Sequence, residues 1–353
     1  MTDLPLCIRL CLIIERLQLD RYLAVGKRLI WIDVAKALAI LSVVVGHTYL
    51  YGNPLLSFVM SFHIPLFFVL SGYTFNVQKL NKAKLVKRIV FPYISICVFL
   101  GILSVIHNGS NGLVSFVLSV VWGSGGTVDS FDIPGIGLAW FLLALYCSKV
   151  IFANTEVFFL NFNLNRFLKL LIYIIISYLS FQFTSYLVLP FALSQALVSL
   201  PYLCLGQLCR EIDFSELKRI KFPVICIALT IWVIGLYKGV FFSIGNLFHV
   251  GSLAFGLLMT LSSSFVLLLF FSSLERVFSL SKFFTLISEL GKNSLLLLCL
   301  HQVESAFINW PTVEFISLDG FSFLVSGVIH LMLVVSMYVL IRLSAPALSR
   351  TGL

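Results

Sequence analysis

The sequence predicts an all-α, polytopic integral membrane protein with about ten transmembrane helices, and three observations lead to this fold class. First, 60% of the 353 residues are hydrophobic and only 11% are charged, whereas about a quarter of the residues of soluble domains are charged. Second, the apolar residues form runs of about 20, the length that a helix needs to cross a bilayer. Third, lysine and arginine gather between alternate runs, as they do in cytoplasmic loops.

The apolar runs give the expected order of the transmembrane helices, with both termini in the cytoplasm. Their bounds are about 30–50, 57–76, 89–107, 138–155, 170–188, 191–209, 222–242, 251–273, 293–310 and 321–343. The apolar stretch 113–122 is too short to span and is expected to be a re-entrant or interfacial piece. In this topology the outer loops contain no lysine or arginine, as the positive-inside rule requires, and Lys238 in the outer half of its helix is the exception.

The first 28 residues differ from the rest because charged side chains interrupt their apolar stretch. Arg9, Glu15 and Arg16 lie within or beside the run LCIRLCLII, so a signal peptide is not favoured. We expect 1–28 to be a cytoplasmic amphipathic segment on the inner membrane surface, and a dispensable leader is the alternative. Residues 29–353 are expected to form one membrane domain.

Charge and cysteine content restrict the classes of partner. The net charge of +9 is explained by basic cytoplasmic loops, and no basic stripe interleaved with aromatic residues indicates nucleic-acid binding. The 8 cysteines form no CxxC pair and no His/Cys cluster with zinc-like spacing. We therefore expect neither a disulfide framework nor a metal.

Four ionisable residues lie inside the first two predicted spans: Asp33, Lys36, His47 and His63. A charge near the middle of a membrane helix costs roughly 2.5–3.5 kcal/mol, so function is the first hypothesis for such residues. Lys36 and His47 are eleven positions apart, which places them about 20° apart around a helix and about 16 Å apart along it. One face therefore has a cation near one membrane surface and an imidazole near the other. Antiparallel pairing would bring His63 to a depth similar to that of His47.

This pattern resembles the signature of membrane acyltransferase family 3, in which an Asp opens the first helix and a Lys or Arg precedes a His by eleven positions. The following segment SFHIPLFFVLSGYTF resembles the second-helix signature of the family, and weaker similarity recurs near 140 and in 291–301. The resemblance covers 31–92 best. It implies an integral-membrane O-acyltransferase, most often an O-acetyltransferase, that transfers the acyl group of acetyl-CoA to cell-surface polysaccharides or their lipid-linked precursors. A bacterial-type inner membrane is the expected location.

The resemblance makes His47 the candidate general base, since an imidazole titrates near neutral pH and can take the proton of a hydroxyl. The alternative is a histidine that only packs between helices. Direct attack by the activated hydroxyl is favoured over an acyl-histidine intermediate. Asp33 is a further catalytic candidate or only a helix cap, and His63, before a helix-breaking Pro65, is a catalytic or acceptor-binding candidate.

Three basic residues are candidates for binding the coenzyme. Lys36 can bind a phosphate or the thioester end of acetyl-CoA, and Lys87 and Arg88 can meet its phosphates. The alternatives are a Lys36 whose ammonium reaches to the interface and a basic loop that only sets topology or attracts anionic lipid.

Three further residues are candidates for binding the acceptor. Trp140 can stack on a sugar or belong to an interfacial aromatic belt. His301 and Glu304, one helical turn apart, can form a His–carboxylate unit in the site or a purely structural hydrogen bond. His107, His249 and His330 match no pattern and are treated as structural or interfacial.

Two other function classes fit the hydropathy. A polysaccharide-precursor transporter or flippase would explain the helices and some buried charges, but it would not need the shared face of Lys36 and His47. A scaffold for a polysaccharide-assembly complex is a weaker third possibility. An oligomer is possible for each class.

Overall fold

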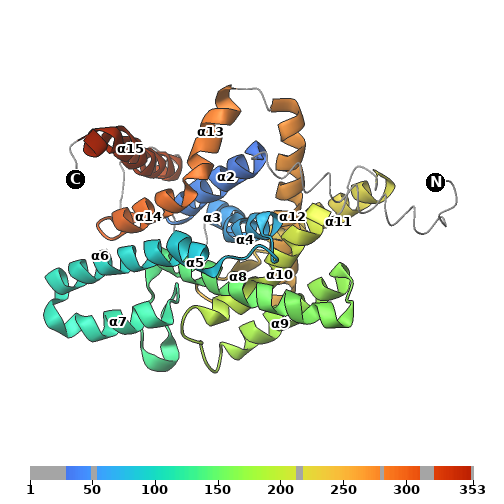
Figure 1. The fold of residues 1–353 in the computed structure, drawn as a ribbon, viewed down its shortest axis with the longest axis horizontal. Coiled ribbons are helices and arrows are strands. Elements are labelled where there is room, and N and C mark those ends of the chain that lie inside the picture. Colours follow the sequence, from blue (N-terminus) through green and yellow to red (C-terminus); the bar gives the residue numbers. More distant parts are fainter. Residues whose placement is uncertain (1–28, 49–53, 212–217, 279–281, 311–321, 351–353) are drawn as a thin grey trace.

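The computed structural model describes residues 29–48, 54–211, 218–278, 282–310 and 322–350, and these are mainly helical (Figure 1). Within them, 5 helices are long and apolar enough to cross a membrane, or 6 if one bent pair counts as a single span. The multi-pass, α-helical class is thus confirmed, whereas ten spans and cytoplasmic termini stay predictions. The expected amphipathic segment 1–28 lies outside the described residues.

The helices follow the predicted spans, with bounds that differ by several residues. They are α2 (Ile30–Gly46), α3 (Pro54–Met60), α4 (His63–Thr74), α5 (Lys82–Leu85), α6 (Phe91–Asn108), α7 (Leu113–Trp122), α8 (Trp140–Phe159), α9 (Arg166–Phe183), α10 (Leu193–Glu211), α11 (Lys218–Tyr237), α12 (Leu253–Phe278), α13 (Lys282–Lys292), α14 (Ser294–Ser305) and α15 (Ser322–Arg350). A short antiparallel hairpin of β1 (Phe241–Ser243) and β2 (Phe248–Val250) lies between α11 and α12.

The second predicted span is broken into α3 and α4. Pro65 has no N–H to donate to the carbonyl of Ser61 four residues earlier. Ser263 Oγ on α12 donates to that carbonyl instead, at 2.7 Å, and Trp232 Nε1 on α11 donates to Ser61 Oγ at 2.8 Å. Neighbouring helices therefore satisfy the polar groups that the break releases, as a membrane interior requires.

Helix α10 lies at the centre of the bundle and is buried along most of its length. Two glycines let it approach α4 closely: a Cβ on Gly72 would overlap the backbone of Leu203, and one on Gly206 would overlap that of Val69. Small residues at such positions allow helix backbones to pack against each other in membranes.

One ion network joins α8, α9 and α10 at one end of the bundle. Arg166 binds Glu156 and Glu211, each at 2.6 Å, and Lys169 binds Glu156 at 2.9 Å. Two cations and two carboxylates balance each other, which makes their partial burial tolerable.

The hairpin of α6 and α7 forms one edge of the molecule (Figure 1). Tyr93 on α6 donates to the carbonyl of Val120 on α7 at 2.6 Å. The short apolar piece expected at 113–122 is indeed a ten-residue helix. A groove of about 490 Å³ lies between this hairpin and α14, lined in part by Ser104, Ser115 and Gln302.

The sequence analysis places no helix between the spans that end near 273 and begin near 293, but the structure has α13 there. Its buried residues Phe284, Ser288 and Gly291 recur at helical spacing and form one apolar face. That face packs on α2, where Gly291 lies against the backbone of Asp33 so closely that a Cβ would overlap it. A bend of 63° then leads into α14.

Candidate functional site

His47 lies at the C-terminal end of α2, where its backbone N–H closes the last turn on the carbonyl of Val43 at 3.2 Å. The side chain lies deep among other helices and is nevertheless solvent-accessible. The centroid of the His301 ring is 5.4 Å away. His47 is therefore an imidazole that a substrate can reach within an otherwise buried cluster.

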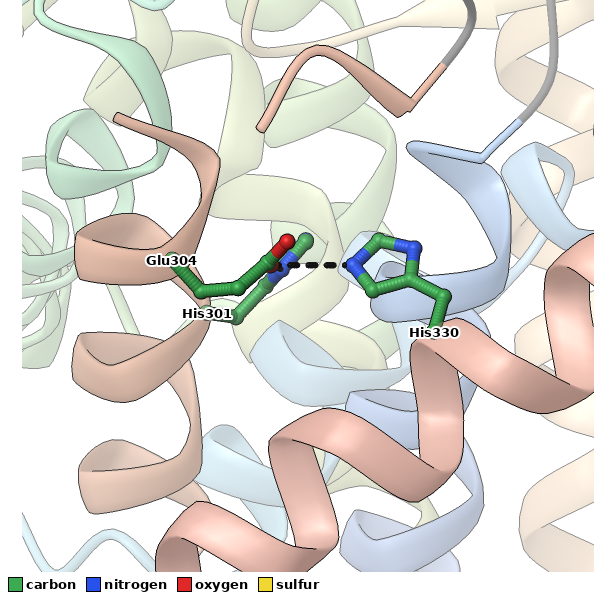
Figure 2. Close-up of side chains that lie close together, drawn as sticks. All are labelled: His301, Glu304 and His330. Carbon is green, nitrogen blue, oxygen red and sulfur yellow. Dashed lines mark hydrogen bonds and ion pairs between the residues drawn. The ribbon is translucent and has the colours of Figure 1, made fainter. Parts of the chain in front are cut away.

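A buried hydrogen-bond network lies beside His47 and connects α14, α15 and the end of α2. Figure 2 shows the carboxylate of Glu304 between the rings of His301 and His330. Glu304 Oε2 is 3.1 Å from Nδ1 of His301 and 3.0 Å from Nε2 of His330. Trp310 Nε1 donates to Glu304 Oε1, and Thr48 Oγ1 lies 2.8 Å from Nδ1 of His330.

These partners assign the tautomers of the two buried histidines. An ionised carboxylate only accepts hydrogen bonds, so Nδ1 of His301 and Nε2 of His330 each hold a proton. Nδ1 of His330 then accepts from the Thr48 hydroxyl at 2.8 Å, a shorter contact than the 3.2 Å from this hydroxyl to the carbonyl of Val44. Nε2 of His301 keeps a lone pair, and among the described residues it is fully buried without a hydrogen-bond partner.

The same three side chains are the ones that could hold a metal ion. The donor atoms of His301, Glu304 and His330 lie within 4.8 Å of one another, and two histidines with one carboxylate are a known zinc ligand set. Direct hydrogen bonds use Nδ1 of His301, Nε2 of His330 and Oε2 of Glu304, so these three side chains already hold one another in place. The absence of a metal stays a prediction.

A second cluster, of cations, lies near the opposite end of α2. The charges of Lys36 on α2 and Arg88 before α6 both act on Lys149 of α8. Nζ of Lys149 lies 5.3 Å from the ring centroid of Phe75. Lys36 and Lys149 are half-buried, whereas Arg88 and the neighbouring Lys87 are exposed. Lys36 and Arg88 thus both lie near Lys149, and the expected roles of Lys36, Lys87 and Arg88 in binding the coenzyme stay predictions.

Asp33 lies far from His47 along α2, whereas His63 lies near enough for its charge to act on His47. Asp33 is buried in the first turn of α2, whose N-cap is Leu29, and fourteen residues separate it from His47, about 21 Å along the helix. Nδ1 of His63 donates to the carbonyl of Val59 at 2.7 Å, which satisfies a group left over by the break before α4. Catalytic roles for both stay predictions.

The three expected acceptor-binding residues are enclosed by protein. The Trp140 ring packs against Gly125 and Gly245, at a separation that leaves no room for a Cβ on either glycine. His301 and Glu304 are bonded to each other, with 0% and 4% of their surface exposed. Their roles in binding acceptor stay predictions.

On sequence grounds His330 is treated as structural or interfacial, and Lys149 is not singled out. Both lie inside predicted transmembrane spans, so the argument that a buried ionisable residue needs a reason applied to them as well. Thr48 and Trp310 had no such signal, because only tertiary contacts show their part in the network.

Comparison with known proteins supplies the family. The model of the family described as "Acyltransferase domain" matches residues 29–341. No curated protein and no solved structure matches the chain. The match covers nearly all of the predicted membrane domain and agrees with the two-helix pattern of Lys36, His47 and His63. The chain therefore belongs to membrane acyltransferase family 3.

Proposed function

We propose that this acyltransferase is an O-acetyltransferase that moves the acetyl group of acetyl-CoA to a hydroxyl of a cell-surface polysaccharide or its lipid-linked precursor. One observation carries the proposal: α2 has a cation cluster near its start and an accessible imidazole at its end. The two are about 16 Å apart along the helix. This separation suits an elongated donor that has anionic phosphates at one end and a thioester at the other.

The cation cluster supports the choice of donor. The charges of Lys36 and Arg88 both repel the ammonium group of Lys149, and in a partly buried environment this repulsion is stronger than in water. A bound phosphate relieves it through charge-assisted hydrogen bonds. In the predicted topology this end of α2 faces the cytoplasm, where a coenzyme A thioester would be available.

His47 acts as the general base in the proposed reaction. It takes the proton of the acceptor hydroxyl as the oxygen attacks the carbonyl carbon of the thioester. The carbon–oxygen bond forms, the carbon–sulfur bond breaks, and the thiolate takes up the proton to leave as free coenzyme A. The C-terminal end of a helix favours a positive charge, so the position of His47 at the end of α2 favours the uptake of this proton.

The test compares wild type with His47→Gln, purified in detergent and given acetyl-CoA together with the envelope glycan of the source strain. Wild type is expected to release free thiol in step with acetylated glycan, and His47→Gln to be slower by roughly 10²–10⁴-fold. The control is His249→Gln on β2, which bonds only Gly251 among the described residues and should retain activity.

Two results would contradict the proposal. Full turnover by a folded His47→Gln protein would remove His47 from the reaction. A wild type that moves glycan precursor across vesicles without releasing thiol would favour the transporter.

A further inference from the structure

We propose that Glu304 and His301 form a proton-accepting pair that acts through His47, and that His330 and Thr48 hold this pair in place. This inference rests on the proposed function, because it concerns the fate of the proton that His47 removes. Glu304, His330 and Thr48 are positioning residues in this account, and His47 alone touches the substrate.

The carboxylate of Glu304 fixes the orientation of His301. Its Oε2 accepts the Nδ1 proton at 3.1 Å, which leaves the lone pair on Nε2, the opposite edge of the ring. A second bond to His330 at 3.0 Å and the bond from Trp310 hold the carboxylate itself. Thr48 holds His330 in turn. Each hydrogen bond of the network thus has a defined donor and acceptor, and the network ends at Nε2 of His301.

A purely structural role for His301 would not explain the free lone pair on its Nε2. A buried polar atom without a hydrogen bond costs about 1–3 kcal/mol, and Nε2 of His301 is fully buried. A histidine that served only packing would bond through both nitrogens. Of the two neighbouring imidazoles, the His330 ring has its centroid 4.9 Å away but is buried and bonded to Glu304, whereas the His47 ring, with its centroid 5.4 Å away, belongs to a solvent-accessible residue. Since His301 is wholly enclosed, a proton can come to it from His47 but not directly from an acceptor.

The charges of the network favour the uptake of a proton by His301. Among the described residues, the titratable groups beside His301 are His47 at the end of α2, His330 from α15 and Glu304 on its own helix, and His63 from α4 acts on His47. Glu304 is the only negative charge among them. A buried carboxylate needs a compensating positive charge. One proton arriving on His301 turns the network from net negative to neutral.

The proton transfers balance as follows. The acceptor O–H bond breaks and its proton goes to one nitrogen of His47, while the other nitrogen passes a proton to Nε2 of His301. His301 becomes an imidazolium paired with Glu304, and His47 stays neutral beside the tetrahedral intermediate. When the carbon–sulfur bond breaks, the same proton returns through His47 to the thiolate, and the free thiol leaves.

The decisive variant is Glu304→Gln, because Trp310 dictates how the amide must lie. Trp310 donates to the Oε1 position, so the amide oxygen has to occupy it. The amide NH2 then stands where Oε2 was and donates to both histidines. Nδ1 of His301 becomes an acceptor, and its proton moves to Nε2. The substitution keeps the shape of the side chain but removes the lone pair from Nε2 of His301.

We expect Glu304→Gln to lower kcat for acetyl transfer by roughly 10–100-fold at neutral pH, within the range of acid–base effects. The KM for acetyl-CoA should stay within about two-fold, since the donor contacts are unchanged. The deficit should shrink toward alkaline pH, where the acceptor hydroxyl loses its proton more readily. The matched control is Glu289→Gln on α13, which removes a carboxylate paired only with Lys292 among the described residues.

A second measurement needs no variant and no turnover. Nitrogen-15 NMR of histidine-labelled wild type in detergent reports which ring nitrogen holds the proton. His63 and His301 should both have their proton on Nδ1, and in Glu304→Gln the signal assigned to His301 should move to the other tautomer while that of His63 stays. The signal of His330 should change in the opposite sense, because its Nε2 then accepts from the amide. If wild type transfers no acetyl group, the proposed function fails while the NMR still tests the geometry.

Three results would overturn the inference. The first is a wild-type His301 with its proton on Nε2. The second is a Glu304→Gln protein that transfers acetyl groups at the wild-type rate, or one that is slowed equally at every pH and unfolds at a lower temperature. The third is one equivalent of metal in the purified protein together with loss of activity on chelation, since the network would then be a metal site.

Discussion

Single cations near the start of α2 are expected to set the affinity for the donor rather than the rate of the chemical step. Lys36→Gln and Lys149→Gln should each raise the KM for acetyl-CoA roughly tenfold, which corresponds to about 1.4 kcal/mol, and leave kcat within about two-fold. Steady-state kinetics at low ionic strength measure this, since salt screens charge interactions. Lys84→Gln, on exposed α5, is the control. An unchanged KM in both test variants would place the phosphates elsewhere.

At the same scale, the sequence predicts residues on one helix better than residues that meet across helices. Helical periodicity relates Lys36 to His47, because both belong to α2. The contacts of His47 with His301, and of Glu304 with His330, join segments far apart in the chain. No local spacing can show such contacts. The His301–Glu304 bond was foreseen as one alternative because the two residues lie one turn apart on α14.

Among the elements, the packing of α4 on α10 is expected to be most sensitive to side-chain size. Gly72→Ala should lower the free energy of unfolding by roughly 1–3 kcal/mol, because its Cβ would overlap the backbone of Leu203. Gly46→Ala is the control, since its Cβ would make ordinary contacts at 3.4 Å or more. Thermal unfolding in detergent compares the two. Equal transition temperatures would show that α4 and α10 are less tightly packed than described.

Hydropathy locates the helices but not their breaks. Pro65 indicates a break in the apolar run 57–76, but hydropathy does not place it at Ser61 and Phe62, nor does it show the donors from Ser263 and Trp232 that satisfy the released groups. Hydropathy also fails to predict helix α13, for a related reason. Its apolar face is narrow and flanked by Lys282 and Lys292, so its mean hydropathy resembles that of a loop, whereas its periodicity predicts a helix.

For the whole molecule, the orientation in the membrane is the prediction with the widest consequences. In a cysteine-free background, Asp129→Cys should react with an impermeant maleimide on intact cells, because acidic loops without lysine or arginine lie outside. Lys84→Cys should react only after permeabilisation. The opposite pattern would invert the topology and put the cation cluster on the side away from cytoplasmic acetyl-CoA.

The straight course of α2 from Ile30 to Gly46 has a consequence for donor selection. Because a continuous helix barely stretches, the distance between the cations and His47 is fixed. A thioester donor whose phosphates and carbonyl are separated by that distance can place its carbonyl beside the imidazole. In a shorter or longer donor the carbonyl would lie away from the imidazole. Discrimination between carriers would then come from the backbone itself and would need no pocket shaped around the acyl group.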